Sequence, residues 1–245
     1  MPEGPSILLM KEKLMGFVGQ KVLSVRGNVK TDIDLLIGKT LVEIRTFGKQ
    51  TYLVFGEIVV RIHLLLFGSY SIDEQTKTDR ALRLYLQFAN GDLYFYTCSV
   101  KILGREYLSG IEWASDVLSD AWQPRVAKSK LQKIPGTMVC DALLDQEIFA
   151  GVGNIIKNEV LFRTGIQPES LVGSLPAKKL QELIGEARKY SFEFLEWKRA
   201  FVLKKHWQVH TKKICPKCNM PLVKKNTGVL RRRSFYCLND QKLYQ

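Results

Sequence analysis

The apolar residues of this chain follow one period in its first half and another in its second, which limits the folds open to it. From Lys21 to about Leu103 they tend to recur at every second position, the period of half-buried strands. From about Trp113 onward they recur at helical spacing. We therefore expect an α+β protein with an antiparallel β-sandwich in its first half and helices in its second.

Local signals refine this plan. Apolar residues alternate from Leu82 to Phe88 and run into Asn90-Gly91, a dipeptide that predicts a β-hairpin between two apolar strands. Other strands are expected near residues 22–25, 41–44, 52–55 and 58–62, and helices over residues 6–17, 124–134, 138–149, 155–164, 176–190 and 192–203. We predict three domains: residues 1–115 with the sandwich and an N-terminal helix, residues 116–207 with helices, and residues 208–245 with a small finger.

The charge balance indicates the class of partner. The chain has 37 Lys and Arg against 24 Asp and Glu, a net charge of +13. Such a surface attracts polyanions, among which nucleic acid is the commonest. A membrane is not expected as a partner, because no apolar run approaches the roughly 20 residues that span a bilayer.

The cysteines bear on the compartment. Five cysteines are an odd number, and no signal-peptide pattern accompanies them, so a disulfide framework is not expected. We expect a reducing, bacterial-type cytoplasm with the protein at the nucleoid. Cys98 and Cys140 stand in apolar surroundings and are interpreted as buried free thiols.

The other three cysteines form a metal-binding pattern. Cys215 and Cys218 are separated by two residues, Cys237 follows after eighteen more, and Asp240 stands where a ribbon of two knuckles has its fourth ligand. Carboxylate oxygen binds zinc at about 2.0–2.2 Å, so a site of three thiolates and one carboxylate is chemically possible. The alternative is a ribbon held by packing without metal. His206 and His210 fall outside this spacing and are expected at the surface or facing DNA.

The N-terminus places Pro2 beside Glu3. Removal of Met1 would expose the secondary amine of Pro2, and α-amino groups titrate near about 7.7–8.0. Such an amine can attack an electron-poor carbon and form a covalent iminium, with Glu3 as a neighbouring acid. The alternative is an ordinary flexible chain end.

Four further features are suited to a nucleic-acid partner. Asn154 follows Gly151-Val152-Gly153 at an expected helix start, where it would serve as an N-cap, as an anion contact, or as both. Lys49 lies on a turn between strands, and Arg231-Arg232-Arg233 offer forked donors for phosphate. The apolar run from His63 to Gly68, which contains Leu65, Leu66 and Phe67, is either core or a wedge inserted between bases.

Taken together, Pro2-Glu3, Lys49, Gly151 to Asn154 and the finger from Arg232 to Cys237 resemble the formamidopyrimidine-DNA glycosylase/endonuclease VIII family, in its order and approximate spacing. The resemblance covers essentially the whole chain. It implies a helix-two-turn-helix in the helical part, a zinc finger, and a monomer that acts on double-stranded DNA containing a damaged base or an abasic site.

The resemblance also implies an activity and its residues. The activity is that of a DNA glycosylase of base-excision repair with AP lyase activity. Pro2 would attack C1′ of a flipped nucleotide, with Glu3 as general acid/base. Lys49 would be a further catalytic residue, and Lys49, Asn154 and Arg232 would bind phosphates.

Within the family, Pro2 to Pro5 and the consecutive void-filling residues Leu65, Leu66 and Phe67 look more like the endonuclease VIII branch. Residues 96–103 also lack the Pro-Arg-Arg-Phe pattern of enzymes that act on 8-oxoguanine. Oxidised pyrimidines are therefore the expected substrates. The fourth ribbon position departs from the family, which has cysteine there instead of Asp240.

Two other classes of function compete with this interpretation. One is a catalytically inactive protein of the same fold that binds damaged or abasic DNA. The other is a zinc-ribbon protein associated with ribosomes or polymerase, which explains the basic finger and leaves the N-terminus unexplained.

Overall fold

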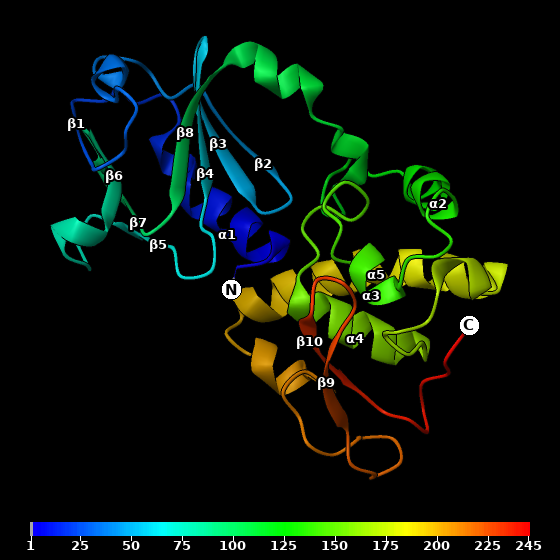
Figure 1. Cartoon of the computed structure of the whole chain (residues 1–245). Helices are drawn as coiled ribbons and strands as arrows, with labels where there is room; N and C mark the ends of the chain where they lie inside the picture. The colour runs from blue at the N-terminus through cyan, green and yellow to red at the C-terminus, as the bar shows by residue number, and fades with distance from the viewer. Residues whose placement is uncertain (1) are drawn as a thin grey trace. The chain divides into compact units, whose positions relative to one another are not determined.

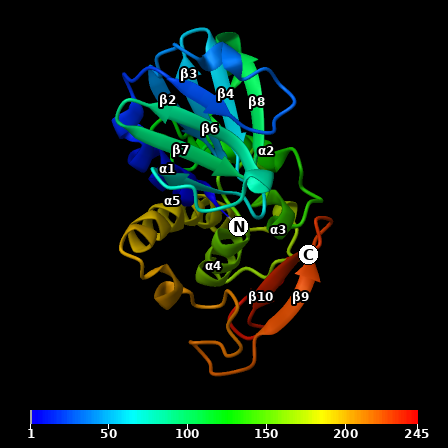
Figure 2. The same ribbon diagram turned by 90° about the vertical axis from the view of Figure 1, so that its left-hand side faces the viewer.

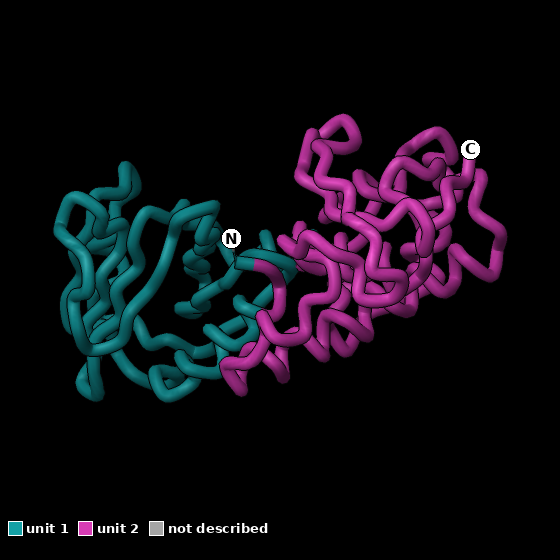
Figure 3. The backbone as a smooth tube through the Cα atoms, turned by 90° about the horizontal axis from the view of Figure 1, so that it is seen from below, with its two compact units in different colours: residues 1–2, 6–111 teal, residues 3–5, 112–245 magenta. Residues whose placement is uncertain are grey.

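The computed structural model describes residues 2–245 and divides into two compact units (Figure 3). Unit 1 contains Pro2 and residues 6–111, and unit 2 contains residues 3–5 and 112–245. The helical part and the finger belong to one unit, and the expected domain limits at residues 115 and 207 stay a prediction.

Unit 1 is built from two four-stranded antiparallel sheets and the first helix (Figures 1 and 2). One sheet has the order β1-β6-β7-β5 and the other β2-β3-β4-β8. Apolar residues from both sheets and from α1 share one core, including Met10, Leu53 and Leu86. The expected antiparallel sandwich is thus confirmed. The elements are α1 (Gly4–Leu14), β1 (Ser24–Arg26), β2 (Glu43–Phe47), β3 (Gln50–Phe55), β4 (Ile58–His63), β5 (Ser69–Ile72), β6 (Leu82–Phe88), β7 (Gly91–Tyr96) and β8 (Ser99–Gly104).

The hairpin expected at Asn90-Gly91 is present, with its turn displaced by one residue. Phe88 pairs with Gly91, so the two connecting residues are Ala89 and Asn90. The Asn90 amide donates to the carbonyl of Gly16, 2.8 Å away. Asn90 therefore has a hydrogen-bond partner that is distant in the sequence, and a prediction from the turn sequence alone does not take such a partner into account.

Unit 2 contains four α-helices and a two-stranded hairpin among the residues described. They are α2 (Pro124–Gln132), α3 (Val139–Ala142), α4 (Asn154–Thr164), α5 (Ala177–Arg199), β9 (Val223–Thr227) and β10 (Arg232–Tyr236). Within residues 2–245, no helix is long and apolar enough to cross a membrane.

Two helix predictions were wrong. The helix expected over residues 138–149 is a single turn, because the Asp145 carboxylate accepts the amide of Glu147 and the Gln146 side chain bonds Leu144 and Val152 carbonyls in a loop. The break expected near residue 191 is absent, because α5 continues through this position. The Ser191 hydroxyl is accommodated there by donating to the Ala187 carbonyl at 2.7 Å.

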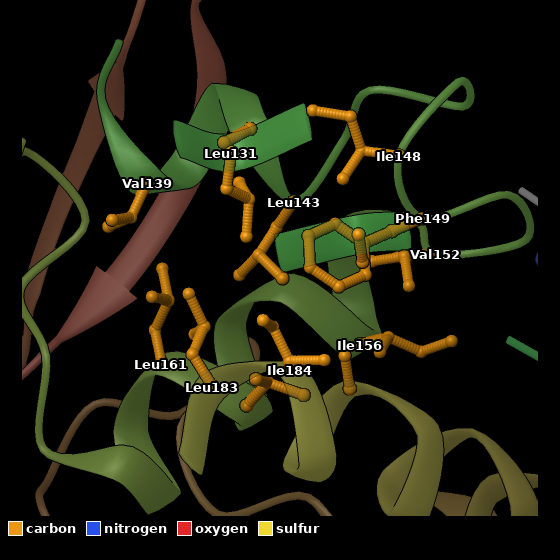
Figure 4. Packing of buried hydrophobic residues seen from close by; sticks show 14 of the residues in the cluster. Leu131, Val139, Leu143, Ile148, Phe149, Val152, Ile156, Leu161, Leu183 and Ile184 are labelled. Atoms are coloured by element: carbon orange, nitrogen blue, oxygen red, sulfur yellow. The ribbon is translucent and has the colours of Figure 1, made fainter. Parts of the chain in front are cut away.

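The core of unit 2 includes apolar residues from the segment that precedes α4. Leu143, Phe149 and Val152 are fully buried and point toward Ile156 on α4 and Ile184 on α5 (Figure 4). Apolar residues of the non-helical segment before α4 therefore pack as closely as those of the helices. This packing explains why the segment has helix-like hydrophobic spacing without being a helix.

The finger is attached to α4 by polar and apolar contacts. The buried Glu159 carboxylate accepts backbone N–H groups from Gln208, Val209 and His210 at 2.7–3.0 Å. Phe162 packs against an apolar cluster that includes Val209, Cys215, Phe235 and Cys237. In both ribbon views the β9–β10 hairpin lies beside α4 (Figures 1 and 2). The finger is therefore part of the packed unit.

His210, expected at the surface or facing DNA, is half-buried, and its ring contacts Asn158, Trp207 and Phe235 within unit 2. Asn158 donates its side-chain amide to the Arg233 carbonyl and accepts the amide N–H of Phe235 through Oδ1, which orients the Asn158 side chain. The Asn158 nitrogen therefore faces His210 Nδ1 at 3.1 Å, and the neutral ring accepts. Burial, followed by the positive charge of Lys157, lowers the pKa of His210 to about 4.

We expect His210 to make the fold acid-sensitive. Its pKa is lower in the folded than in the unfolded protein, so the unfolded chain takes up a proton first and stability falls as pH drops from 6.5 toward 4. Between pH 7 and 5 the loss is about 2 kcal/mol. Urea unfolding at both pH values should show this loss in the wild type and a smaller one in His210→Gln. Exposed His206 provides the matched control His206→Gln, and an equal pH effect in all three proteins would contradict the assignment.

Candidate active site

The segment after Pro2 is anchored at the start of α4. Glu3 is only 1% exposed, and its carboxylate accepts the amide N–H groups of Ile155 at 2.7 Å and Ile156 at 3.2 Å. The amide of Gly4 donates to the Gly151 carbonyl at 2.9 Å. A segment about 150 residues away in the chain thus completes the N-terminus of this helix.

This contact has a clear electrostatic cause. The first amide groups of a helix have no partner within the helix, and the helix dipole favours a negative charge there. The Glu3 carboxylate meets both requirements. The N-cap position is occupied by Gly153, so Asn154 is the first residue of the helix and not its N-cap.

The glycines of Gly151-Val152-Gly153 make room for this anchor. A Cβ atom on Gly153 would lie 2.4 Å from the Glu3 carboxyl carbon. A Cβ on Gly4 would lie 2.8 Å from the Gly151 Cα. Gly151 also has a φ of 98°, which side chains rarely adopt. The motif was predicted as a tight turn, and the structure adds that its glycines admit the N-terminal segment.

Pro2 takes its place from this anchor. It is the residue before Glu3 and is half-buried. One peptide bond therefore joins it to a carboxylate held by two hydrogen bonds. The condition that Met1 be removed concerns a residue outside the described part of the chain and stays a prediction.

Asn154 and Arg232 are brought to the same region of unit 2. The Asn154 amide donates to the Arg233 carbonyl at 3.0 Å, and Arg232 is the neighbouring residue on β10. The sequence placed these residues 78 positions apart, and the packing of the hairpin on α4 joins them. The start of α4 thus contacts both the Glu3 carboxylate and the arginine-bearing strand.

Unit 1 brings together the other predicted residues. Lys49 follows Gly48 in the two-residue turn between β2 and β3, and Gly48 has a φ of 56°, as the first residue of a type II′ hairpin turn requires. Gln50, next to Lys49, pairs with His63 at the end of β4. Burial, then the charges of Lys49 and Arg61, lower the pKa of His63. Lys49 therefore lies near the loop that follows β4.

That loop carries Leu65, Leu66 and Phe67, which are 49%, 47% and 75% exposed. The core alternative for these residues was wrong. The neutral His63 ring accepts the Leu65 amide at 2.9 Å, and Gly68 donates to the Leu64 carbonyl at 2.8 Å, so the loop is a defined turn. Three apolar side chains in water on a defined turn favour a binding role.

The finger contains the metal-binding group predicted from the sequence. Ligand atoms of Cys215, Cys218, Cys237 and Asp240 all lie within 4.8 Å of one another. Asp240 Oδ2 is 3.1 Å from Cys215 Sγ and 3.2 Å from Cys237 Sγ. Zinc–sulfur bonds of about 2.3 Å in a tetrahedron separate neighbouring sulfurs by about 3.8 Å, so the four residues fit one zinc ion. Such a four-ligand site would hold the finger together.

Sequence reasoning missed three polar residues that position this region. They are Lys157 and Glu159, which are fully buried on α4, and Asp141 on α3, whose carboxylate accepts the amides of Val229 and Leu230 at the hairpin turn. Three polar residues follow Ile156 directly, a lysine, an asparagine and a glutamate, and together they spread over more than half of the helix circumference. Such residues are expected at the surface until the finger is known to cover them.

Comparison with known proteins agrees with this architecture. Residues 113–196 match the formamidopyrimidine-DNA glycosylase H2TH domain. The chain is 28% identical over 282 residues to endonuclease 8-like 3 of Mus musculus, covering 99% of this chain and 46% of that protein. It is 29% identical over 181 residues to the DNA-(apurinic or apyrimidinic site) lyase Nei2 of Mycolicibacterium smegmatis, covering 71% of each. The chain thus spans about half the length, or less, of the endonuclease 8-like 3 relatives it matches.

A solved structure shares the fold over nearly the whole chain. The formamidopyrimidine-DNA glycosylase of Lactococcus lactis, bound non-covalently to DNA containing an AP site, superposes with a TM-score of 0.85 at 22% identity, covering 98% of this chain and 99% of that one. The sandwich, the H2TH helices and the finger together make up the fold of that glycosylase. The chain therefore contains the H2TH domain of the formamidopyrimidine-DNA glycosylase/endonuclease VIII family, is similar to members of that family along its length, and has their fold.

We expect Gly153→Ala to destabilise the protein by about 2 kcal/mol, because the new methyl group displaces Glu3 and removes the cap of α4. Chemical unfolding measures the effect. Gly185→Ala is the matched control: Gly185 lies within α5 with open space around its Cα, so alanine should stabilise by up to about 1 kcal/mol. Wild-type stability of Gly153→Ala would show that Glu3 does not depend on this space.

Proposed function

We propose that this protein is a bifunctional DNA glycosylase and AP lyase that removes oxidised bases, with oxidised pyrimidines as preferred substrates. The observation that carries the proposal is the Glu3 carboxylate held at the N-terminus of α4 one residue from Pro2. A reactive amine beside a fixed carboxylate is the combination that covalent catalysis at a sugar carbon requires.

The chemistry starts from the secondary amine of Pro2 after Met1 has been removed. The nitrogen lone pair attacks C1′ of a flipped nucleotide, the bond from C1′ to the base breaks, and the base leaves with the bonding electrons and takes up a proton. Opening of the sugar ring then gives an iminium at C1′. A damaged base has to leave the stack before this carbon is accessible.

The iminium prepares strand cleavage. Its positive charge acidifies C2′, loss of a C2′ proton expels the 3′ phosphate by β-elimination, and water hydrolyses the iminium to regenerate the amine. Glu3 exchanges protons at the sugar during these steps. Its two hydrogen bonds from α4 hold the carboxylate in one orientation, which shortens the search for a productive geometry.

Phosphate contacts would hold the DNA against this centre. Lys49 and Arg232 supply cations, and Asn154 supplies an amide at the start of α4. The finger and the segment before it, residues 198–239, contain twelve Lys and Arg and no Asp or Glu. This region carries most of the net charge, which supports a polyanionic partner there.

The exposed loop supports duplex DNA containing a flipped nucleotide as the substrate. Leu65, Leu66 and Phe67 would fill the space that the nucleotide leaves, as apolar wedges do between base steps. The preference for oxidised pyrimidines follows from these consecutive wedge residues and from residues 96–103, which lack the Pro-Arg-Arg-Phe pattern. Relatives named endonuclease 8-like support the same branch.

Borohydride reduction tests the covalent step. The Met1-free protein should form a trapped adduct with a duplex containing an oxidised pyrimidine or an abasic site, and Pro2→Gly and Glu3→Gln should lose base excision while duplex binding largely survives. Glu3→Gln keeps an acceptor for α4, and Glu12→Gln on the exposed face of α1 is its matched control. Absence of any adduct with the wild type would leave the inactive DNA-binding alternative.

We expect purified protein to contain about one zinc ion per chain, measured by elemental analysis. Asp240→Cys should retain zinc against a stronger chelator, because thiolate is a softer ligand than carboxylate. Cys237→Ser should lose the metal, whereas Cys98→Ala, at a buried thiol in unit 1, should keep it. A zinc ratio near zero in the wild type would mean that packing alone holds the ribbon.

A further inference from the structure

Lys157 is a buried lysine that the proposed chemistry does not use. It lies on α4, its exposed fraction is zero, and its ammonium donates to Ser234 Oγ at 2.8 Å and to the Arg233 carbonyl at 3.3 Å. Ser234 Oγ is in turn 2.6 Å from Thr227 Oγ1 on β9. The ammonium therefore contacts the middle of the finger hairpin from inside unit 2.

Burial of this group is unfavourable by itself. Desolvation is the main cause that lowers the pKa of Lys157, to about 8, so the side chain is still mostly an ammonium at neutral pH. A methionine of similar length would fill the same space without the desolvation penalty of a charge. The position of the ammonium, and what it contacts, therefore need a reason other than packing.

The reason lies in one backbone carbonyl. Asn154, Lys157 and Asn158 occupy positions i, i+3 and i+4 of α4, which place side chains on one helix face. All three donate to the carbonyl oxygen of Arg233, at 3.0, 3.3 and 3.4 Å. This face of α4 therefore sets the position of β10 at the residue next to Arg232.

A second anchor holds the other side of Arg232. The Asp141 carboxylate accepts the amides of Val229 at 2.7 Å and Leu230 at 3.3 Å in the hairpin turn. A Cβ on Gly228 would lie 2.3 Å from both Asp141 oxygens, so the turn fits closely. Arg232 lies between this turn and the anchored Arg233 and Ser234.

Strand geometry puts Arg232 on the same side of β10 as Lys157. Side chains at i and i+2 of a strand share a face, so Arg232 points to the face on which Ser234 contacts the ammonium. The positive charge of Arg232 is also among the causes that lower the pKa of Lys157, which shows that the two cations lie close enough to repel. This repulsion opposes any folding back of the guanidinium over the ammonium.

We propose that Lys157 is a positioning residue for Arg232: it anchors β10 through the Arg233 carbonyl and Ser234, and its positive charge keeps the guanidinium from folding over the ammonium, which favours contact with a DNA phosphate. The proposal rests on the proposed function in one respect, that Arg232 binds phosphate. Lys157 itself is buried and does not touch the DNA.

A double-mutant cycle tests this role. The full chain is titrated with a duplex carrying a non-cleavable abasic-site analogue over a series of salt concentrations. We expect Arg232→Ala to weaken binding about tenfold and to reduce the slope of log K against log salt by about 0.9, because one phosphate contact is lost. Lys157→Met should lower affinity and slope in the same direction, and adding it to Arg232→Ala should cause no further loss.

Lys189→Met is the matched control, since Lys189 on α5 is 66% exposed and carries the same charge. It should change affinity and slope little, and its addition to Arg232→Ala should be additive. Ser234→Ala removes one partner of Lys157 without changing any charge, and it should reproduce a smaller loss through Arg232. Thermal unfolding of each variant identifies any that fail to fold. If Lys157→Met does not fold, Ser234→Ala replaces it in the double-mutant cycle.

Two outcomes overturn the proposal. One is an unchanged salt slope in Lys157→Met and Ser234→Ala, and the other is a loss that adds fully to that of Arg232→Ala. The experiment requires no catalysis, so it is separable from the borohydride test. If no adduct is trapped but Lys157 and Arg232 are still coupled, only the enzyme assignment is wrong. If an adduct is trapped but the two losses add fully, only the role of Lys157 is wrong.

Discussion

The hydrogen bonds from the first turn of α4 to the Glu3 carboxylate are the interaction on which the rest of the site depends. They satisfy amide groups that a helix leaves without partners, and they hold a carboxylate where the helix dipole stabilises its charge. Pro2 takes its position from the same contact. The glycines at positions 4, 151 and 153 are explained by the space this contact needs.

The same helix also positions the finger. Its first turn binds Glu3 and, through Asn154, the Arg233 carbonyl, and its next turn reaches that carbonyl through Lys157 and Asn158. Further along α4, Glu159 and Phe162 hold the segment that leads into the finger. A single, largely buried helix therefore links the N-terminal segment at Glu3 to the strand that carries Arg232, and a disturbance at either end is expected to reach the other.

Stability and function overlap in this region. Glu3 has a proposed catalytic role and is also a helix cap, so its replacement changes both. The fully buried Lys157 and the half-buried His210 have lowered pKa values, which introduces pH-dependent stability next to the finger. The four candidate metal ligands would hold the knuckles of the ribbon, whereas Asp141 and α4 hold the hairpin that carries Arg232. These two supports are separate in the structure.

The periodicity of the apolar residues predicted the sandwich and the helical half, and the spacing of three cysteines and an aspartate predicted the ribbon. These features can be recognised in the sequence because strand and helix periods and metal-ligand spacing are local properties. Local chemistry also singled out Pro2, Glu3, Lys49, Asn154 and Arg232 as candidates. Only the tertiary structure showed that Glu3 caps α4, that Leu65 to Phe67 are exposed, that Lys157 is buried, and that the His210 ring packs against other side chains. Each of these depends on a partner that is distant in the sequence. The segment that packs against a helix end supplies its cap, and the segment that packs over polar helix residues buries them.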